Sequence, residues 1–162
     1  MGAGKSTMLK KFMSNKLGFD CIDLDHAIAA DLNIRPERLG EWILANGFPE
    51  FRDKERTKLM RLLNHPASMV IALGGGALSA DILAILQNNI ENYLVFVDTP
   101  LEVCLSRIKD DPERPLAQIS EAELKKLYEE RRKVYLEADL ALSEDQIKEI
   151  DALEALVHNL HN

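Results

Sequence analysis

Residues 1–7 read MGAGKST, and this stretch is the strongest indication of the fold of the whole chain. The pattern Gly-x-Gly-Lys-Ser-Thr opens a segment, 6–16, in which apolar residues recur at helical spacing. Glycines and backbone N–H groups at the start of a helix bind phosphate, a Lys in this place reaches the terminal phosphate oxygens, and the Ser hydroxyl can bind Mg²⁺. The alternative is a flexible glycine-rich terminus. The apolar helix directly behind the motif favours a phosphate-binding loop.

Composition narrows the class of protein. The 162 residues amount to one domain, with 46% apolar residues and a net charge of -7, which disfavours nucleic acid as a partner. No apolar run reaches the length of about 18 residues that crosses a membrane. The two cysteines, Cys21 and Cys104, have neither disulfide-framework nor metal-ligand spacing. We therefore expect a cytoplasmic protein that acts on a small ligand.

Strands alternate with helices along the chain. The apolar runs 69–73 and 93–98 are typical of parallel strands buried on both faces, and shorter strands are expected at 19–25 and 138–142. Helices are expected at 6–16, 26–32, 35–46, 51–63, 79–88, 100–109, 121–136 and 146–160. This alternation predicts an α/β fold of three layers, with a parallel sheet between helices.

Polar and glycine residues follow two of these strands, where ligands of open α/β sheets bind. Asp23 and Asp25 end the first strand, and alternate residues of a strand point to opposite sides, so the two carboxylates need not share a role. Capping of the next helix by Asp25 is the other interpretation. Gly74, Gly75 and Gly76 follow the second strand, and they allow either a close ligand approach or a tight turn.

Arginines form the remaining candidates. Arg52 stands three residues before Glu55, so it can clamp a carboxylate ligand, although the spacing alone favours a surface ion pair. Arg107, Arg114 and Arg131 lie around the polar stretch 110–120, whose prolines suit a mobile lid. The charged helix that carries Arg131 has the alternative of being a solvated face.

Together these motifs resemble the shikimate kinase family, P-loop kinases of the nucleoside monophosphate kinase type. The resemblance runs in order over nearly the whole chain. It covers MGAGKST at 1–7, Asp23-x-Asp25, Gly47 followed by Phe51-Arg52-x-x-Glu55, Gly74–Gly76, Arg114-Pro115-Leu116, and Arg131-x-x-x-Tyr135 before Ala138-Asp139. It implies an α/β/α P-loop kinase that transfers the γ-phosphoryl group of ATP to the 3-hydroxyl of shikimate, with Mg²⁺, in aromatic amino-acid biosynthesis.

The resemblance also implies a role for each residue. The loop would hold the nucleotide phosphates. Lys5 and the lid residue Arg114 would also be catalytic. The residues that would bind the nucleotide are Gly2, Ala3, Gly4, Lys5, Ser6, Thr7, Arg107 and Arg114. Arg107 matches the position that packs on adenine. Mg²⁺ would bind Ser6 directly and Asp23 through water. The hydroxyls of shikimate would bind Asp25, which can also accept the proton. Its carboxylate would bind the clamp of Arg52 and Arg131, and Gly74, Gly75 and Gly76 would line the pocket.

The implied organisation is one P-loop kinase domain over 1–162, with a substrate-binding region at about 25–56 and a lid at about 108–120. The implied partner is shikimate, with no nucleic acid and no membrane, and the expected state is a monomer. Two other functions stay open: a kinase for another small hydroxylated acid, and a nucleotide-binding protein without catalysis.

One departure from the family concerns the sheet. A phosphate-binding loop of this kind normally follows a central β-strand, and residues 1–7 have none before them in this sequence. In the implied fold that strand lies between the strands ending at Asp25 and near Leu73 on one side and the strand ending at Val97 on the other. A gap there leaves buried backbone groups unpaired. We therefore expect either that Met1 is an internal methionine of a longer protein, which we favour, or that the neighbouring strands have moved together.

Overall fold

The computed structural model describes residues 3–109 and 120–160, and for 108 and 109 it describes the backbone alone. Four short strands carry the sheet structure: β1 (Asp20–Asp23), β2 (Met69–Ala72), β3 (Val95–Asp98) and β4 (Leu140–Ser143). The helices of the first half are α1 (Lys5–Phe12), α2 (Leu24–Asp31), η1 (Pro36–Arg38), α3 (Leu39–Asn46), α4 (Phe48–Leu63) and α5 (Ala80–Gln87). Those of the second half are α6 (Leu101–Lys109), α7 (Glu121–Tyr135), α8 (Glu144–Glu149) and α9 (Leu153–Leu160).

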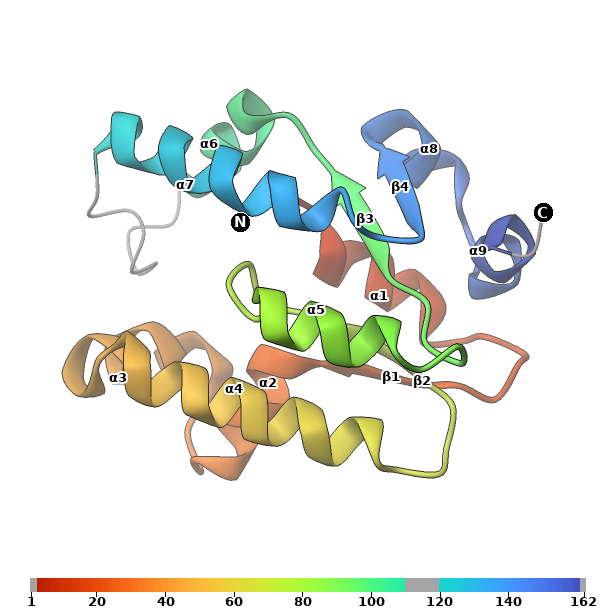
Figure 1. Ribbon diagram of the computed structural model, residues 1–162, viewed down its shortest axis with the longest axis horizontal. Coiled ribbons are helices and arrows are strands. Elements are labelled where there is room, and N and C mark those ends of the chain that lie inside the picture. The colour runs from red at the N-terminus through yellow and green to blue at the C-terminus, as the bar shows by residue number, and fades with distance from the viewer. Residues whose placement is uncertain (1–2, 110–119, 161–162) are drawn as a thin grey trace.

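The strands form two separate parallel pairs. β1 pairs with β2, with Asp20 opposite Met69, and β3 pairs with β4, with Val95 opposite Leu140. In the described part of the chain β2 and β3 are not hydrogen-bonded to each other. Figure 1 shows the two pairs with α1 beside them. The expectation that the neighbouring strands have moved together is therefore wrong, because β2 and β3 form no pair with each other in the described residues.

The two pairs nevertheless share their faces, as the halves of one sheet do. Ile71 and Leu73 at β2 and Leu94 before β3 pack against the core of α2, α3, α4 and α5. Val70 of β2 and Val95 of β3 pack against the opposite core, which α1 and α9 cover. The fold is thus the expected α/β fold with helical layers on both faces of parallel strands. Two hydrophobic clusters, one on each face, take the place of a single core.

Most helices lie close to where the sequence predicts them, but their bounds differ at several places. The helix expected over 6–16 ends at Phe12 as α1, and the one expected over 35–46 is the 3₁₀ turn η1 followed by α3. The largest difference is at the end of the chain. A single helix was expected over 146–160, but α8 ends at Glu149 and α9 starts at Leu153. Ile150 between them is extended, with φ -82° and ψ 102°, and its side chain is buried in the hydrophobic cluster that α1 and α9 cover. Its carbonyl also accepts a hydrogen bond from Lys11 Nζ at 3.1 Å. The helix is interrupted because Ile150 reaches the core only when the chain turns there.

Helix starts are explained by local capping. Ser120 and Glu123 form a capping box at the start of α7, and Ser143 and Gln146 form another at the start of α8.

No helix in the described ranges is long and apolar enough to cross a membrane.

Candidate active site

The phosphate-binding motif forms the turn into α1. Gly4 is the N-cap of the helix and has φ +90°, a left-handed conformation that a glycine adopts without strain. The carbonyl of Ala3 accepts a hydrogen bond from Thr99 Oγ1 at 3.0 Å, which fastens the turn to the end of β3. Lys5 starts the helix and is half-buried, while the side chains of Ser6 and Thr7 are exposed. Gly2 lies outside the described residues.

Ser6 and Asp23 come together at the end of β1. Ser6 Oγ donates a hydrogen bond to Asp23 Oδ2 at 2.9 Å. The other carboxylate oxygen accepts from the backbone nitrogens of Asp25 and His26, so Asp23 is the N-cap of α2. The suggestion that Asp25 caps this helix is therefore wrong. A hydroxyl beside a carboxylate is a donor set that Mg²⁺ uses when nucleotide phosphates and water complete its shell.

Asp25 points away from the cap into a half-buried site. Its Oδ1 atom is buried and accepts no hydrogen bond from any described residue. Burial raises the pKa of the Asp25 carboxyl, and the neighbouring Asp23 carboxylate raises it further, while Lys5 and Arg52 oppose the shift. An unpaired acceptor of this kind is costly unless a ligand donates to it.

Glu55 adds a second unpaired oxygen. Its side chain is 2% exposed, and its Oε2 atom accepts a hydrogen bond from Arg52 Nη1, while Oε1 has no partner among the described residues. Burial raises the pKa of Glu55, against the opposing effect of Arg52. The Arg52–Glu55 pair therefore exists as the spacing predicts, but it lies inside the site and is not a surface pair.

Arg131 completes this cluster from α7. Burial lowers the pKa of its guanidinium, and the like charge of Arg52 lowers it further. A β-carbon on Gly76 would lie 2.9 Å from Arg131 Nη2 and closer still to the Arg52 guanidinium. The sequence separates these three residues by up to 79 positions, and the fold brings them to one place. Two guanidinium groups share one glutamate, which leaves positive charge for an anionic ligand.

The glycine run is tightly packed against charged side chains. A β-carbon on Gly74 would lie 2.9 Å from both Asp25 Oδ1 and Glu55 Oε1. Gly74 also accepts a turn hydrogen bond from the backbone nitrogen of Ala77 at 3.2 Å. The tight turn is therefore confirmed, and Gly74 and Gly76 also leave space for the neighbouring carboxylates and guanidiniums of the protein itself.

Two contributors were not among the predicted site residues. Tyr135 donates its hydroxyl hydrogen bond to the Gly75 carbonyl and packs on Phe96, with ring centroids 5.3 Å apart. Its i, i+4 spacing from Arg131 on α7 was the available signal. Thr99, which holds Ala3, is 2% exposed, and nothing in its sequence context marks it.

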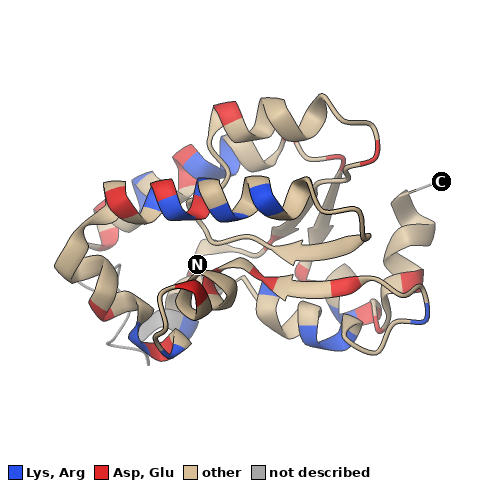
Figure 2. Ribbon diagram, turned by 90° about the horizontal axis from the view of Figure 1, so that it is seen from below, with Lys and Arg blue, Asp and Glu red and all other residues tan. Residues whose placement is uncertain are grey.

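The remaining predicted residues lie beside the turn into α1 or beyond the described ranges. Arg107 Nη2 is 2.8 Å from Glu144 Oε1, and Arg107 Nη1 would be 3.8 Å from a β-carbon on Gly4. Arg107 therefore lies over the phosphate-binding turn. Arg114 and most of the predicted lid, 108–120, lie outside the described residues. In Figure 2 the blue and red ribbon positions of charged residues lie mostly on the helices, while the strands are mostly tan.

Known proteins match the chain over nearly its whole length. The sequence profile of a family described as shikimate kinase matches residues 1–160. A shikimate kinase of Persephonella marina is 35% identical over 143 residues, which are 88% of this chain and 84% of that protein. One of Aquifex aeolicus is 34% identical over 155 residues, covering 93% of this chain and 89% of its own.

Solved structures agree with these relatives. The crystal structure of shikimate kinase from Aquifex aeolicus has a TM-score of 0.74 and 30% identity, covering 98% of this chain and 93% of that one. The shikimate kinase of Acinetobacter baumannii in complex with shikimate has a TM-score of 0.77 and 28% identity, covering 98% of this chain and 89% of that one. With a profile match over 160 residues and the same fold, the chain belongs to the shikimate kinase family.

Proposed function

We propose that this chain transfers the γ-phosphoryl group of ATP to the 3-hydroxyl of shikimate, giving shikimate 3-phosphate and ADP. The observation that carries the proposal is the cluster of Arg52, Arg131, Glu55 and Asp25 around the glycine run. Shikimate has one carboxylate and three hydroxyls. The cluster offers surplus positive charge at one end and unpaired carboxylate oxygens at the other.

The acid end of the substrate would meet the arginines. Guanidinium groups bind carboxylates through two parallel hydrogen bonds, and the bond strengthens where water is excluded. Glu55 holds the Arg52 guanidinium from a buried position, so little conformational freedom is lost when the ligand binds. Gly74, Gly75 and Gly76 leave the space that the substrate ring needs beside these side chains.

The hydroxyl end would meet Asp25. Its buried Oδ1 atom accepts no hydrogen bond from the described residues, so a substrate hydroxyl can donate to it. The raised pKa of Asp25 makes it a better base than an ordinary aspartate. In the reaction the hydroxyl oxygen forms a bond to the γ-phosphorus, the bond to the β,γ-bridging oxygen breaks, and Asp25 takes the hydroxyl proton.

The nucleotide end would use the turn into α1. The backbone N–H groups after Gly4 and the Lys5 ammonium offset phosphate charge. The Ser6 and Asp23 pair fits Mg²⁺, Ser6 directly and Asp23 through water. The ion would offset charge on the β- and γ-phosphates. We assign Arg107 to adenine and Arg114, on the lid at 108–120, to the phosphates; both assignments rest on the family resemblance.

The decisive experiment removes the acid clamp and leaves the rest of α4 intact. Arg52→Ala should lower kcat/KM for shikimate by about 10- to 100-fold or more, since one charged hydrogen bond is worth about 1.5–3 kcal/mol. Nucleotide binding should be unchanged. Arg56→Ala is the matched control, because Arg56 lies one turn further along α4 in an exposed pair with Asp81. ADP release, measured with and without shikimate, gives the rates.

The result also separates the other two functions. An unchanged rate in Arg52→Ala would contradict the shikimate assignment. Turnover of gluconate with no turnover of shikimate would indicate a kinase for another hydroxylated acid. ATP binding with no ADP release on any acid would indicate a nucleotide-binding protein without catalysis. We further propose a cytoplasmic monomer without nucleic-acid partners, in keeping with two unpaired cysteines and a net charge of -7.

A further inference from the structure

We propose that Arg132 is a positioning residue, which holds helix α7 in the rotation that aims Arg131 at the carboxylate of the substrate. Its partner is Asp98, the last residue of β3. The inference rests on the proposed function in one respect, because it takes the substrate to be shikimate. Arg132 points to β3 and Arg131 to the glycine run, so any effect of Arg132 on the acid has to pass through the helix.

The first observation is the geometry of the pair between α7 and β3. Arg132 Nε donates to Asp98 Oδ1 at 3.0 Å, and Arg132 Nη2 donates to Asp98 Oδ2 at 2.6 Å. Two parallel bonds between a planar guanidinium and a carboxylate fix the orientation of both groups. One turn earlier on α7, the Tyr128 hydroxyl donates to the Thr99 carbonyl oxygen at 3.0 Å. One face of α7 is therefore fastened to the end of β3.

The second observation is that α7 carries two rows of contacts. Arg131 and Tyr135 lie one turn apart and face the glycine run, where Tyr135 donates to the Gly75 carbonyl and Arg131 lies beside Gly76. Arg132 lies about 100° further round the helix and faces β3. Since both rows belong to one helix, a rotation that frees Arg132 also moves Arg131.

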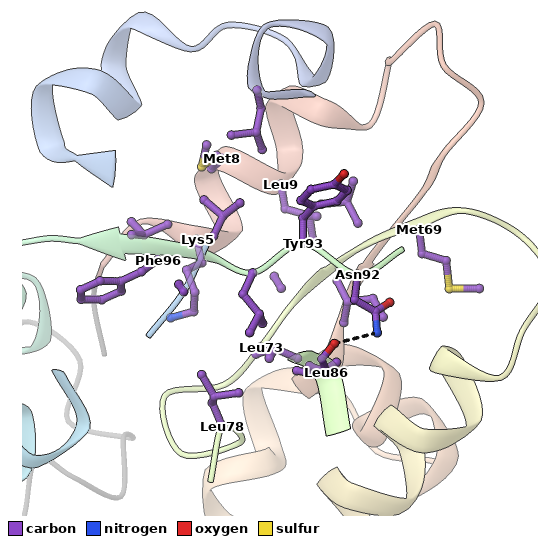
Figure 3. A pocket seen from close by; sticks show the side chains of 18 of the residues that line it. Lys5, Met8, Leu9, Met69, Leu73, Leu78, Leu86, Asn92, Tyr93 and Phe96 are labelled. Carbon is purple, nitrogen blue, oxygen red and sulfur yellow. Dashed lines mark hydrogen bonds between the residues drawn. The ribbon is translucent and has the colours of Figure 1, made fainter. Parts of the chain in front are cut away.

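The third observation is that α7 has little apolar packing of its own. All 15 residues of this helix are described, and Leu124 is the only one of them that is buried. The helix borders a cavity of about 670 Å³, which Figure 3 shows from close by. The residues of α7 that help to line it are Tyr128, Arg131, Arg132 and Tyr135. Because apolar packing is sparse, we infer that polar contacts set the rotation of the helix.

The fourth observation is the charge around the two neighbouring arginines. The hydrogen bond to Asp98 raises the pKa of Arg132, whereas burial lowers the pKa of Arg131 and the like charge of Arg52 lowers it further. Repulsion between Arg131 and Arg52 pushes α7 away from the clamp when no acid is bound, although Glu55 offsets part of it. The Arg132–Asp98 pair opposes that movement.

The exposure of the pair separates a positioning role from a merely structural one. The side chains of Arg132 and Asp98 are 40% and 24% exposed, and ion pairs near the surface contribute little to stability. A structural role alone therefore predicts a small fall in Tm and unchanged kinetics. A positioning role predicts that KM for shikimate changes while Tm hardly does.

The test is a double-mutant cycle on the 162-residue protein, followed by ADP release. Arg132→Ala should raise KM for shikimate about tenfold, leave kcat and KM for ATP within about twofold, and lower Tm by at most about 2–4 °C. In an Arg131→Ala background the same change should not raise KM further, because an effect that passes through one residue is not additive. Lys133→Ala is the matched control, since Lys133 is the next residue of α7 and is exposed.

Two conservative variants separate charge from geometry. Arg132→Lys keeps the charge but cannot form two parallel bonds, so KM should stay raised. Asp98→Asn removes the carboxylate of the partner and should raise KM as Arg132→Ala does. Hydrogen exchange of the 74–76 amides without any ligand needs no substrate. It should accelerate in Arg132→Ala and not in Lys133→Ala, because Tyr135 moves away from Gly75 when α7 turns.

Four outcomes would overturn the proposal. They are an unchanged KM in Arg132→Ala, an additive effect in the Arg131→Ala background, full recovery of KM in Arg132→Lys, and equal exchange at 74–76 in Arg132→Ala and Lys133→Ala. An unaltered chain that releases no ADP with shikimate would contradict the proposed function instead. The exchange at 74–76 would then still decide whether Arg132 holds α7 in place.

Discussion

The carboxyl ends of the strands and the middle of the sheet differ sharply in how well they are held together. At the carboxyl ends hydrogen bonds join segments distant in sequence, among them Ser6 with Asp23, Thr99 with Ala3, and Tyr135 with Gly75. In the middle, β2 and β3 have no direct pairing within the described residues, and the cavity of about 670 Å³ separates them.

In the described chain the site residues come together although β2 and β3 are not paired with each other. Each side chain of the site is positioned by its own helix or turn, and the polar contacts between those segments close the site. Between β2 and β3 the described residues form no such polar link, and apolar side chains of both strands pack against the two hydrophobic clusters. The three changes below test whether the site and the sheet are as separable as this picture requires.

The largest expected effect is on Asp25, where activity and stability should move in opposite directions. Asp25→Asn removes the proposed base, so kcat should fall by about 10²–10⁴-fold. The same change removes a carboxylate whose pKa is raised by burial. At pH 7 we expect Tm to rise by about 2–4 °C, the shift that 1 kcal/mol produces in a domain of this size. Steady-state kinetics and thermal unfolding measure the two.

The pH dependence of the free energy of unfolding tests separately whether the Asp25 carboxylate destabilises the fold. In the range above the ordinary Asp value of 3.8, the folded protein binds more protons at Asp25 than the unfolded chain does. The free energy of unfolding should therefore fall as the pH rises through that range. Asp25→Asn should flatten this fall in part, and Glu55 accounts for the remainder because burial raises its pKa too. If Asp25→Asn lowers Tm and leaves the pH dependence of the unfolding free energy unchanged, burial of the Asp25 carboxylate does not destabilise the fold.

A smaller effect is expected from adding one methyl group to the glycine run. Gly76→Ala places a β-carbon against the guanidiniums of Arg52 and Arg131, whose flexible ends can shift. We expect KM for shikimate to rise about tenfold, which corresponds to about 1.4 kcal/mol, with Tm little changed. Gly18→Ala is the opposite control: its φ is +74° and nothing lies within 4 Å, so stability should fall while KM stays constant. Equal KM in both variants would count against the acid clamp.

The smallest effect is expected at one of the links between the two strand pairs. Tyr135→Phe removes the hydrogen bond to the Gly75 carbonyl and should lower stability by about 0.5–1.5 kcal/mol. Tyr128→Phe is the matched control on the same helix, because its hydroxyl bonds to Thr99 within the β3 side at 3.0 Å. Hydrogen exchange at 74–76 should accelerate only in Tyr135→Phe. Equal acceleration in both would mean that the link is not specific to this contact.

Much of the fold could be predicted because its signals are local. The apolar runs became β2 and β3, and the helix expected over 121–136 is α7 (Glu121–Tyr135). The break at Ile150 could not be predicted, since the segment 146–160 keeps helical spacing and only the position of the hydrophobic cluster that α1 and α9 cover decides where the chain turns. Capping of α2 by Asp25 was one of two interpretations left open, and the N-cap is Asp23, because strand geometry alone does not say which of two aspartates meets the helix.

By itself the sequence determined which chemical groups this protein has and in what order, because a phosphate-binding turn, a capped helix and a buried strand each depend on neighbours a few residues away. Tertiary structure alone decided which groups act together. It buried Glu55 beside Arg52, brought Arg131 from a helix about 80 positions later, and left Asp25 Oδ1 without a partner among the described residues. Burial and long-range contacts set charge and pKa, and no local pattern encodes them. The same holds for β2 and β3, which belong to separate strand pairs in the described chain although both come from buried apolar runs.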